Sequence, residues 1–133
     1  MAQLNPYIFF GGNCREAMTF YQECLGGELF IQTVGDSPMA GQMPPETHNG
    51  VLYAALQGSG MSLMASDNID GSTINVGTAI TLCISGGTKD ETRVLFEKLA
   101  TGGTITGPLQ DEFFGMFGTL TDKFGINWMF QAQ

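Results

Sequence analysis

The chain repeats one pattern twice: a capped amphipathic helix that ends at a pair of glycines and leads into a strand. Asn13 begins the first copy and Thr88 begins the second, while glycine pairs at 26–27 and 102–103 close the two helices. The copies are offset by 75 residues at their starts and by 76 residues at the glycine pairs. A nearly constant offset indicates duplication, so we expect two modules of the same order.

Each module is expected to run strand, helix, strand, strand, strand. Asn13 with Glu16, and Thr88 with Glu91, have the spacing of a capping box, which marks two helix starts. Apolar residues then recur at three- and four-residue steps, so each helix buries one stripe against a sheet. The expected strands are 7–10, 28–34, 51–56 and 61–65 in the first module, and 79–84, 104–106, 116–121 and 126–131 in the second.

The connections are expected to differ in length. Residues 35–49 contain three prolines and predict a mobile loop without regular structure. Residues 58–60 and 122–125 predict hairpin turns. Residues 67–75 predict a linker between the modules, which would span about 1–68 and 76–133 of a single domain covering 1–133.

The expected fold class is α+β. A four-stranded sheet with one helix leaves its other face and an edge uncovered, which favours aggregation. Pairing with a second such sheet removes that hazard. The tandem βαβββ modules are therefore expected to form a cupped, open mixed β-barrel with the helices outside. The inner faces would enclose a cavity of the kind that binds small ligands.

Charge excludes two classes of partner. The chain carries 5 Lys and Arg against 13 Asp and Glu, and its net charge of −8 repels phosphate backbones and anionic membranes. The longest apolar run, residues 51–56, is far shorter than the ~20 residues that span a bilayer. We therefore expect a cytoplasmic protein that binds neither nucleic acid nor membrane.

The three cysteines are expected to be reduced thiols. Cys14 and Cys24 lie ten positions apart on one expected helix, about 15 Å along its axis, which is beyond the ~7 Å limit for a disulfide. Cys83 lies in an expected strand, and the spacing is not that of a zinc site. Among the acidic residues, Asp67 and Asp70 are expected to be solvated charges of a loop.

Five segments, taken in order and at their spacing, carry a family resemblance: residues 6–14, 20–21, 25–28, 64–67 and 121–129. They resemble the PhnB-like branch of the glyoxalase/bleomycin-resistance/dioxygenase (vicinal oxygen chelate) superfamily. The resemblance implies paired βαβββ modules, a homodimer and a small-molecule cavity. Members of this branch are often labelled 3-demethylubiquinone methyltransferases, but we expect no glycine-rich strand-to-helix turn for a methyl-donor nucleotide in this chain.

The resemblance also implies where a metal would be held. The four ligand positions of the superfamily's metal enzymes map onto Asn5, Ser62, Ala79 and Met129. An amide, a hydroxyl, a methyl and a thioether do not hold a catalytic divalent metal tightly, because such sites use nitrogen or carboxylate donors. A register shift of two residues keeps the same face and offers no better donors: Tyr7, Met64, Thr81, Asn127 or Gln131. We therefore expect no metal and no cofactor.

His48 is the only histidine and thus a candidate for acid–base catalysis, since its unperturbed pKa lies near neutrality. A solvated loop residue is the alternative reading. In many PhnB-like sequences a histidine begins the third strand, where this chain has Tyr53. That exchange removes a base that titrates near pH 7, so no catalytic residue is assigned.

Three functions remain open. The preferred one is a metal-free protein that binds a small apolar or aromatic molecule. The second is a metal-dependent lyase, isomerase or dioxygenase of the same superfamily, and the third is a ligand-free scaffold dimer. For the preferred function, the residues expected to line the cavity are Tyr7, Phe9, Tyr53, Ser62, Met64, Thr81, Met129 and Gln131.

Overall fold

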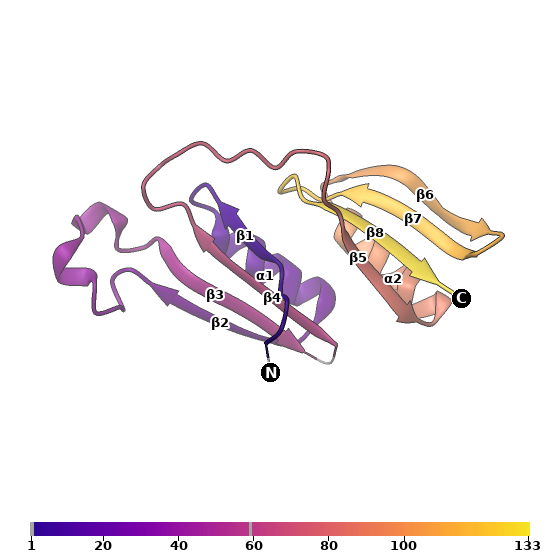
Figure 1. The fold of residues 1–133 in the computed structure, drawn as a ribbon, viewed down its shortest axis with the longest axis horizontal. Coiled ribbons are helices and arrows are strands. Elements are labelled where there is room, and N and C mark those ends of the chain that lie inside the picture. Colours follow the sequence, from indigo (N-terminus) through magenta and orange to yellow (C-terminus); the bar gives the residue numbers. More distant parts are fainter. Residues whose placement is uncertain (1, 59) are drawn as a thin grey trace. The chain divides into compact units, whose positions relative to one another are not determined.

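Each half of the chain folds in the predicted order of strand, helix and three strands (Figure 1). The computed structural model describes residues 2–58 and 60–133 and divides into two compact units, 1–74 and 75–133. The elements of the first unit are β1 (Tyr7–Phe10), α1 (Cys14–Leu25), β2 (Glu28–Thr33), β3 (Val51–Gly58) and β4 (Met61–Asp67). Those of the second are β5 (Leu82–Gly87), α2 (Lys89–Ala100), β6 (Thr104–Glu112), β7 (Gly115–Thr121) and β8 (Asn127–Ala132).

The two sheets have equivalent strand orders, β1-β4-β3-β2 and β5-β8-β7-β6. In each sheet the first pair, β1 with β4 or β5 with β8, is parallel, and the other pairs are antiparallel. Figure 1 shows α1 against one face of the first sheet and α2 against one face of the second. Neither α-helix in the described part of the chain is long and apolar enough to cross a membrane.

The core of each unit lies between its helix and its sheet. Buried residues alternate along β7, where every second residue from Met116 to Leu120 is buried, because strand neighbours point to opposite faces. In the first unit Tyr21 of α1 is fully buried. In the second unit the rings of Phe96 on α2 and Phe130 on β8 meet edge to face, with centroids 5.2 Å apart.

The first strand of the second unit begins later than the sequence predicts. The predicted strand covers residues 79–84, whereas β5 begins at Leu82. Parallel pairing aligns Leu82 with Trp128, the second residue of β8. Residues 79 and 80 therefore lie opposite the turn that leads into β8 rather than opposite a strand, and they do not extend the ladder.

The edge strand β6 is longer than predicted. The sequence predicts a strand only at 104–106, but β6 continues past Gly107 and Pro108 to Glu112. An edge strand tolerates a proline, since one side of it lacks a ladder. The register of β6 with β7 breaks twice between residues 105 and 110.

The connections also differ in part from the prediction. Residues 35–49 contain two single-turn 3₁₀ helices, Ala40–Gln42 (η1) and Pro45–Thr47 (η2), so the expectation of no regular structure is wrong. The predicted turn at 122–125 is confirmed, since the Gly125 amide donates to the Asp122 carbonyl at 2.9 Å. The turn predicted at 58–60 includes residue 59, which lies outside the described residues.

One of the two predicted helix caps is confirmed. The hydroxyl of Thr88 accepts a hydrogen bond from the Glu91 amide at 3.0 Å. Asn13 makes no side-chain cap hydrogen bond. At the other end of the helices, Gly26 and Gly102 have φ angles of 78° and 75°, a conformation that glycine adopts at little cost.

The start of α1 is capped instead by Asp67, at the end of β4. Its Oδ1 accepts hydrogen bonds from the amides of Cys14 at 2.9 Å and Gly12 at 3.1 Å. Its Oδ2 accepts a third from the amide of Val51 at 2.9 Å. Asp67 is 7% exposed, so the prediction of a solvated loop charge is wrong. The carboxylate reaches α1 because β4 lies parallel to β1, and Asp67 pairs with Phe10 at the end of that strand.

Removing this carboxylate is expected to destabilise the chain strongly. Asp67→Ala leaves three amides without their acceptor, and we expect a loss of about 3 kcal/mol or more, measured by denaturant unfolding. Asp67→Asn also loses stability, because its amide NH₂ replaces one accepting oxygen. Asp70→Ala is the matched control, because Asp70 is exposed and bonds only locally to Ser72, so no measurable change is expected. Equal stability of the Asp67→Ala and Asp70→Ala proteins would contradict the assigned role.

Candidate functional site

Five of the eight residues predicted to line a cavity lie on one face of the first sheet. They are Tyr7 and Phe9 of β1, Tyr53 of β3, and Ser62 and Met64 of β4. Tyr7 pairs with Met64 across the parallel strands, and residues two apart in a strand share a face. The alternate residues of these strands form the buried face toward α1, so the five side chains lie on the face that α1 does not cover.

This face carries more aromatic surface than the sequence predicts. The Tyr7 and Phe9 rings are 5.1 Å apart, and the Tyr53 ring lies 6.2 Å from that of Phe30 on β2. Tyr7, Phe9 and Phe30 are 40%, 55% and 56% exposed. Phe30 was not predicted here, although the alternation of residues along β2 places its side chain on the face opposite to that of Leu29. The face of the first sheet that α1 does not cover therefore presents four aromatic rings.

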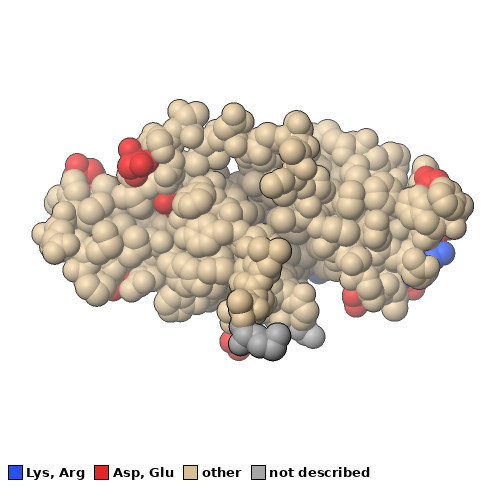
Figure 2. Space-filling model, viewed as in Figure 1, with Lys and Arg blue, Asp and Glu red and all other residues tan. Residues whose placement is uncertain are grey.

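The charge on this side of the first unit is low. Figure 2 shows that this side carries a few acidic side chains and no basic one. The five predicted residues and Phe30 are themselves uncharged, and their polar atoms are two phenol hydroxyls and the hydroxyl of Ser62. Such a surface suits an uncharged or weakly polar ring.

The three remaining predicted residues belong to the second unit. Met129 and Gln131 lie on the face of β8 that points away from α2, and Thr81 is exposed just before β5. Met129 pairs with Thr119, whose hydroxyl is 2.8 Å from that of Thr106. This face carries the hydroxyls of Thr106 and Thr119. That all eight residues line one cavity stays a prediction.

His48 is tied into its own loop. Its Nε2 lies 2.9 Å from the carbonyl oxygen of Ala40 and 3.1 Å from that of Met43. Both partners are acceptors, so Nε2 carries the hydrogen and donates. The backbone carbonyl of His48 accepts from the Gly35 amide at 2.9 Å. These contacts give the imidazole a structural role in joining the two 3₁₀ turns, and catalysis by His48 stays a hypothesis.

The cysteines are free and differ in exposure. Cys14 and Cys24 are buried, whereas Cys83 is exposed. Burial raises the pKa of the Cys14 thiol to about 12, and the negative charge of Asp67 adds to the rise. Partial burial also raises the pKa of Cys83. None of these shifts favours the thiolate that a nucleophilic cysteine requires.

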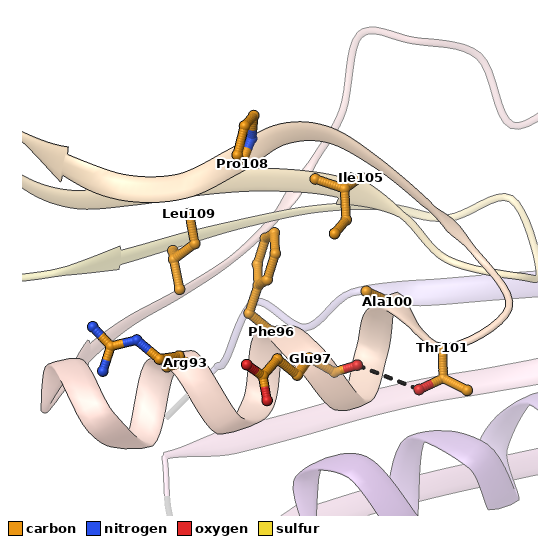
Figure 3. Close-up of a pocket in the computed structure, with 8 residues that line it drawn as sticks. All are labelled: Arg93, Phe96, Glu97, Ala100, Thr101, Ile105, Pro108 and Leu109. Atoms are coloured by element: carbon orange, nitrogen blue, oxygen red, sulfur yellow. Dashed lines mark hydrogen bonds between the residues drawn. The ribbon is translucent and has the colours of Figure 1, made fainter.

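A groove that the sequence did not predict lies between α2 and β6. It encloses about 450 Å³ and none of the eight predicted residues lines it. Figure 3 shows Phe96 projecting from α2 toward Ile105, Pro108 and Leu109 of β6. The sequence missed it because the strand predicted at 104–106 ends before Pro108 and Leu109.

Comparisons with known proteins agree along nearly the whole chain. A family model described as 3-demethylubiquinone-9 3-methyltransferase matches residues 2–131. Protein YjdN of Escherichia coli (strain K12) is 31% identical over 136 residues, which cover 95% of this chain and 92% of YjdN. The crystal structure of protein PA1353 from Pseudomonas aeruginosa has a TM-score of 0.89 and 35% identity, covering 100% of this chain and 98% of PA1353.

Other solved structures extend the likeness to the superfamily. The PhnB protein from Bacillus cereus has a TM-score of 0.80 and 26% identity, covering 99% of this chain and 100% of that protein. A glyoxylase/bleomycin resistance protein/dioxygenase domain from Frankia has a TM-score of 0.68 at 18% identity, covering 99% of this chain and 92% of that domain. The predicted fold class, tandem βαβββ modules of the glyoxalase/bleomycin-resistance type, is confirmed.

One neighbour in fold is known with a metal. A mutant of the fosfomycin resistance protein FosX from Listeria monocytogenes, at 11% identity and a TM-score of 0.68, is known in complex with Mn(II). That Asn5, Ser62, Ala79 and Met129 stand at the metal positions of this chain stays a prediction. Among residues 2–58 and 60–133, no three His, Cys, Asp or Glu side chains are grouped to hold a metal ion.

Thiol modification is expected to distinguish the exposed Cys83 from the buried Cys14 and Cys24. At pH 8 a dithionitrobenzoate titration of the native chain is expected to modify Cys83 alone, and all three thiols after unfolding.

Because the folded pKa of Cys14 exceeds its ordinary value near 9, its stabilising effect is complete below pH 9 and is lost as pH rises toward 12. Compared with Cys14→Ala, the native chain should therefore lose more thermal stability over that range. Rapid native modification of Cys14 would contradict this expectation.

The structural role of His48 is tested by proteolysis. His48→Ala removes the two hydrogen bonds to the loop carbonyls, so thermolysin is expected to cleave within residues 36–49 several-fold faster. His48→Gln keeps a donating NH₂ and should be protected better than His48→Ala. Equal cleavage of the native chain and His48→Ala would show that the imidazole does not order the loop.

Proposed function

We propose that this chain is a metal-free protein that binds a small aromatic or apolar molecule. The chain belongs to the PhnB-like family described as 3-demethylubiquinone-9 3-methyltransferase. It has the fold of the glyoxalase/bleomycin-resistance/dioxygenase superfamily. The ligand lies against the uncovered face of the first sheet. The proposed lining is the predicted set of Tyr7, Phe9, Tyr53, Ser62, Met64, Thr81, Met129 and Gln131, joined by Phe30.

The observation that carries this proposal is the group of four rings on one uncovered sheet face. Three of them, Tyr7, Phe9 and Phe30, leave about half of their surface in contact with water. Aromatic side chains bury large apolar areas and stack on planar ligands with defined geometry. Ser62 lies on the same face and supplies one hydroxyl to orient a polar substituent. The substrate in the family's description contains a quinone ring, which has the planar shape that such a face suits.

Metal-dependent chemistry is the alternative that the superfamily supplies. A lyase, isomerase or dioxygenase of this kind needs nitrogen or carboxylate donors around its metal. The weak donors at the mapped positions support binding without a metal. Elemental analysis of protein purified without a histidine tag separates the two functions, because a stoichiometric divalent metal would favour the enzyme.

Methyl transfer has less support than its name in the family description suggests. The expectation that glycine-rich strand-to-helix turns are missing needs refinement, since Gly11-Gly12 and Gly86-Gly87 precede α1 and α2. The Cys14 amide at the start of α1 and the Gly12 amide before it already donate to Asp67. The Glu91 amide at the start of α2 donates to Thr88. At the start of each helix, an amide that could bind an anion therefore already has an acceptor within the chain.

A homodimer and a cytoplasmic location complete the proposal. Exposed apolar side chains support self-association, including Ile80 at 78% and Phe113 at 100% exposure. Light scattering at several protein concentrations measures the state directly. A strictly monomeric chain that still binds ligand would leave the binding function standing and remove the dimer.

Ligand binding is tested with 1-naphthol, an uncharged planar probe, by isothermal titration calorimetry. Phe9→Ala and Tyr7→Ala are each expected to weaken binding by about tenfold, because each removes a ring worth ~1.5 kcal/mol of contact. Phe113→Ala is the matched control, since Phe113 is fully exposed at the β6–β7 hairpin and outside the proposed lining. Absence of saturable binding at millimolar naphthol, or equal loss in all three variants, would refute the aromatic site.

A further inference from the structure

We propose that the groove between α2 and β6 is a second ligand site, which takes a small amphipathic carboxylate with an alkyl or aryl body. Its volume of about 450 Å³ falls within the range of small-molecule sites, roughly 300–1,000 Å³. It lies on the side of the second sheet that faces α2. The site is therefore independent of the aromatic face proposed above.

The floor and walls of the groove are apolar. Phe96 is 5% exposed and points from α2 toward β6, where Leu109 is half-buried and Ile105 is 51% exposed (Figure 3). Pro108 adds its ring on the β6 side. A hydrocarbon chain lying here would cover Ile105 and the edge of Leu109, and removal of this surface from water would favour binding.

The groove is open because β6 departs from a regular ladder. Its register with β7 breaks between Ile105 and Gly107 and again between Gly107 and Gln110. Gly118 of β7 underlies the groove, because a Cβ there would lie 2.9 Å from Leu109 and 3.0 Å from Phe96. Bulges of this kind bend an edge strand and are common beside functional sites.

The first module differs from the second at the positions that correspond to this groove. Subtracting the offset of 75 residues, Arg93 corresponds to Met18, which is fully buried on α1. β2, the counterpart of β6, pairs with β3 without a break from Glu28 to Gln32. The duplicated helix thus holds an apolar core residue in one copy and a half-exposed guanidinium in the other.

Arg93 is the cation among the described residues that line the groove, and Lys89 lies one helical turn before it on α2. Arg93 pairs with Asp90 at 3.0 Å, with side chains 50% and 95% exposed. Lys89 pairs with Asp111 at 2.9 Å, which links the start of α2 to the end of β6. An exposed pair contributes little, so Arg93 can exchange Asp90 for a ligand carboxylate at low cost.

Glu97 is the other charged residue in the groove lining. Figure 3 shows its carboxylate beside α2, whereas the Phe96 ring projects toward β6. The chain has only five basic residues and a net charge of −8, so most of its surface repels anions. A ligand carboxylate is therefore best accommodated beside Arg93.

The test uses octanoate and follows the methyl resonances of Ile105 and Leu109 by NMR. Saturable shifts are expected at these methyls, with a Kd of about 1 mM or tighter. Arg93→Gln should weaken octanoate binding about threefold and leave 1-octanol binding unchanged, because only the carboxylate uses the guanidinium. Arg15→Gln removes the same charge from α1 and is the matched control, with no change expected.

Three outcomes would overturn the proposal. These are the absence of saturable shifts at about 10 mM octanoate, equal effects of Arg93→Gln and Arg15→Gln, and methyl shifts that follow protein concentration without ligand. The last outcome would assign the groove to self-association. Octanoate shifts should persist in the Phe9→Ala protein, so failure of the aromatic face and failure of this groove are distinguishable.

Discussion

The first unit depends on one buried carboxylate. Asp67 stands at the end of β4 and accepts hydrogen bonds from the amides of Gly12, Cys14 and Val51, so it joins the start of α1 to the start of β3. A buried carboxylate is costly unless every oxygen is bonded, and here both oxygens are. Burial raises the pKa of the adjacent Cys14 thiol, and the negative charge of Asp67 raises it further. The position of α1 on the sheet, and with it the separation of a buried face from an aromatic face, follows from this contact.

Local signals predicted the elements, and long-range pairing decided their ends. The two helices and the order of the strands could be predicted because the apolar spacing of the helices, the cap at Thr88 and the glycine pairs act within a few residues. The start of β5 could not, since it is set by pairing with Trp128, 46 positions from Leu82. Asp67 was misjudged for the same reason, because its partners at Gly12 and Cys14 lie more than 50 positions away in sequence.

The candidate site was predicted only as far as strand alternation reaches. Alternation within β1, β3 and β4 explains why Tyr7, Tyr53 and Met64 lie on one face, since side chains two apart must share it. Phe30 was missed because the prediction did not apply the same alternation to β2. The groove beside α2 was missed because it arises from register breaks in β6, and a bulge leaves no reliable mark in a single sequence.

The hydrogen bond between Trp128 and Asp122 has an optical consequence. The indole Nε1 donates to the Asp122 carboxylate at 2.8 Å, and the ring is 4% exposed. Trp128 is the only tryptophan of the chain and lies in the second unit, so its emission reports on the packing of that unit. Fluorescence and circular dichroism recorded together therefore distinguish a chain whose duplicated halves melt as one from a chain whose halves melt in turn.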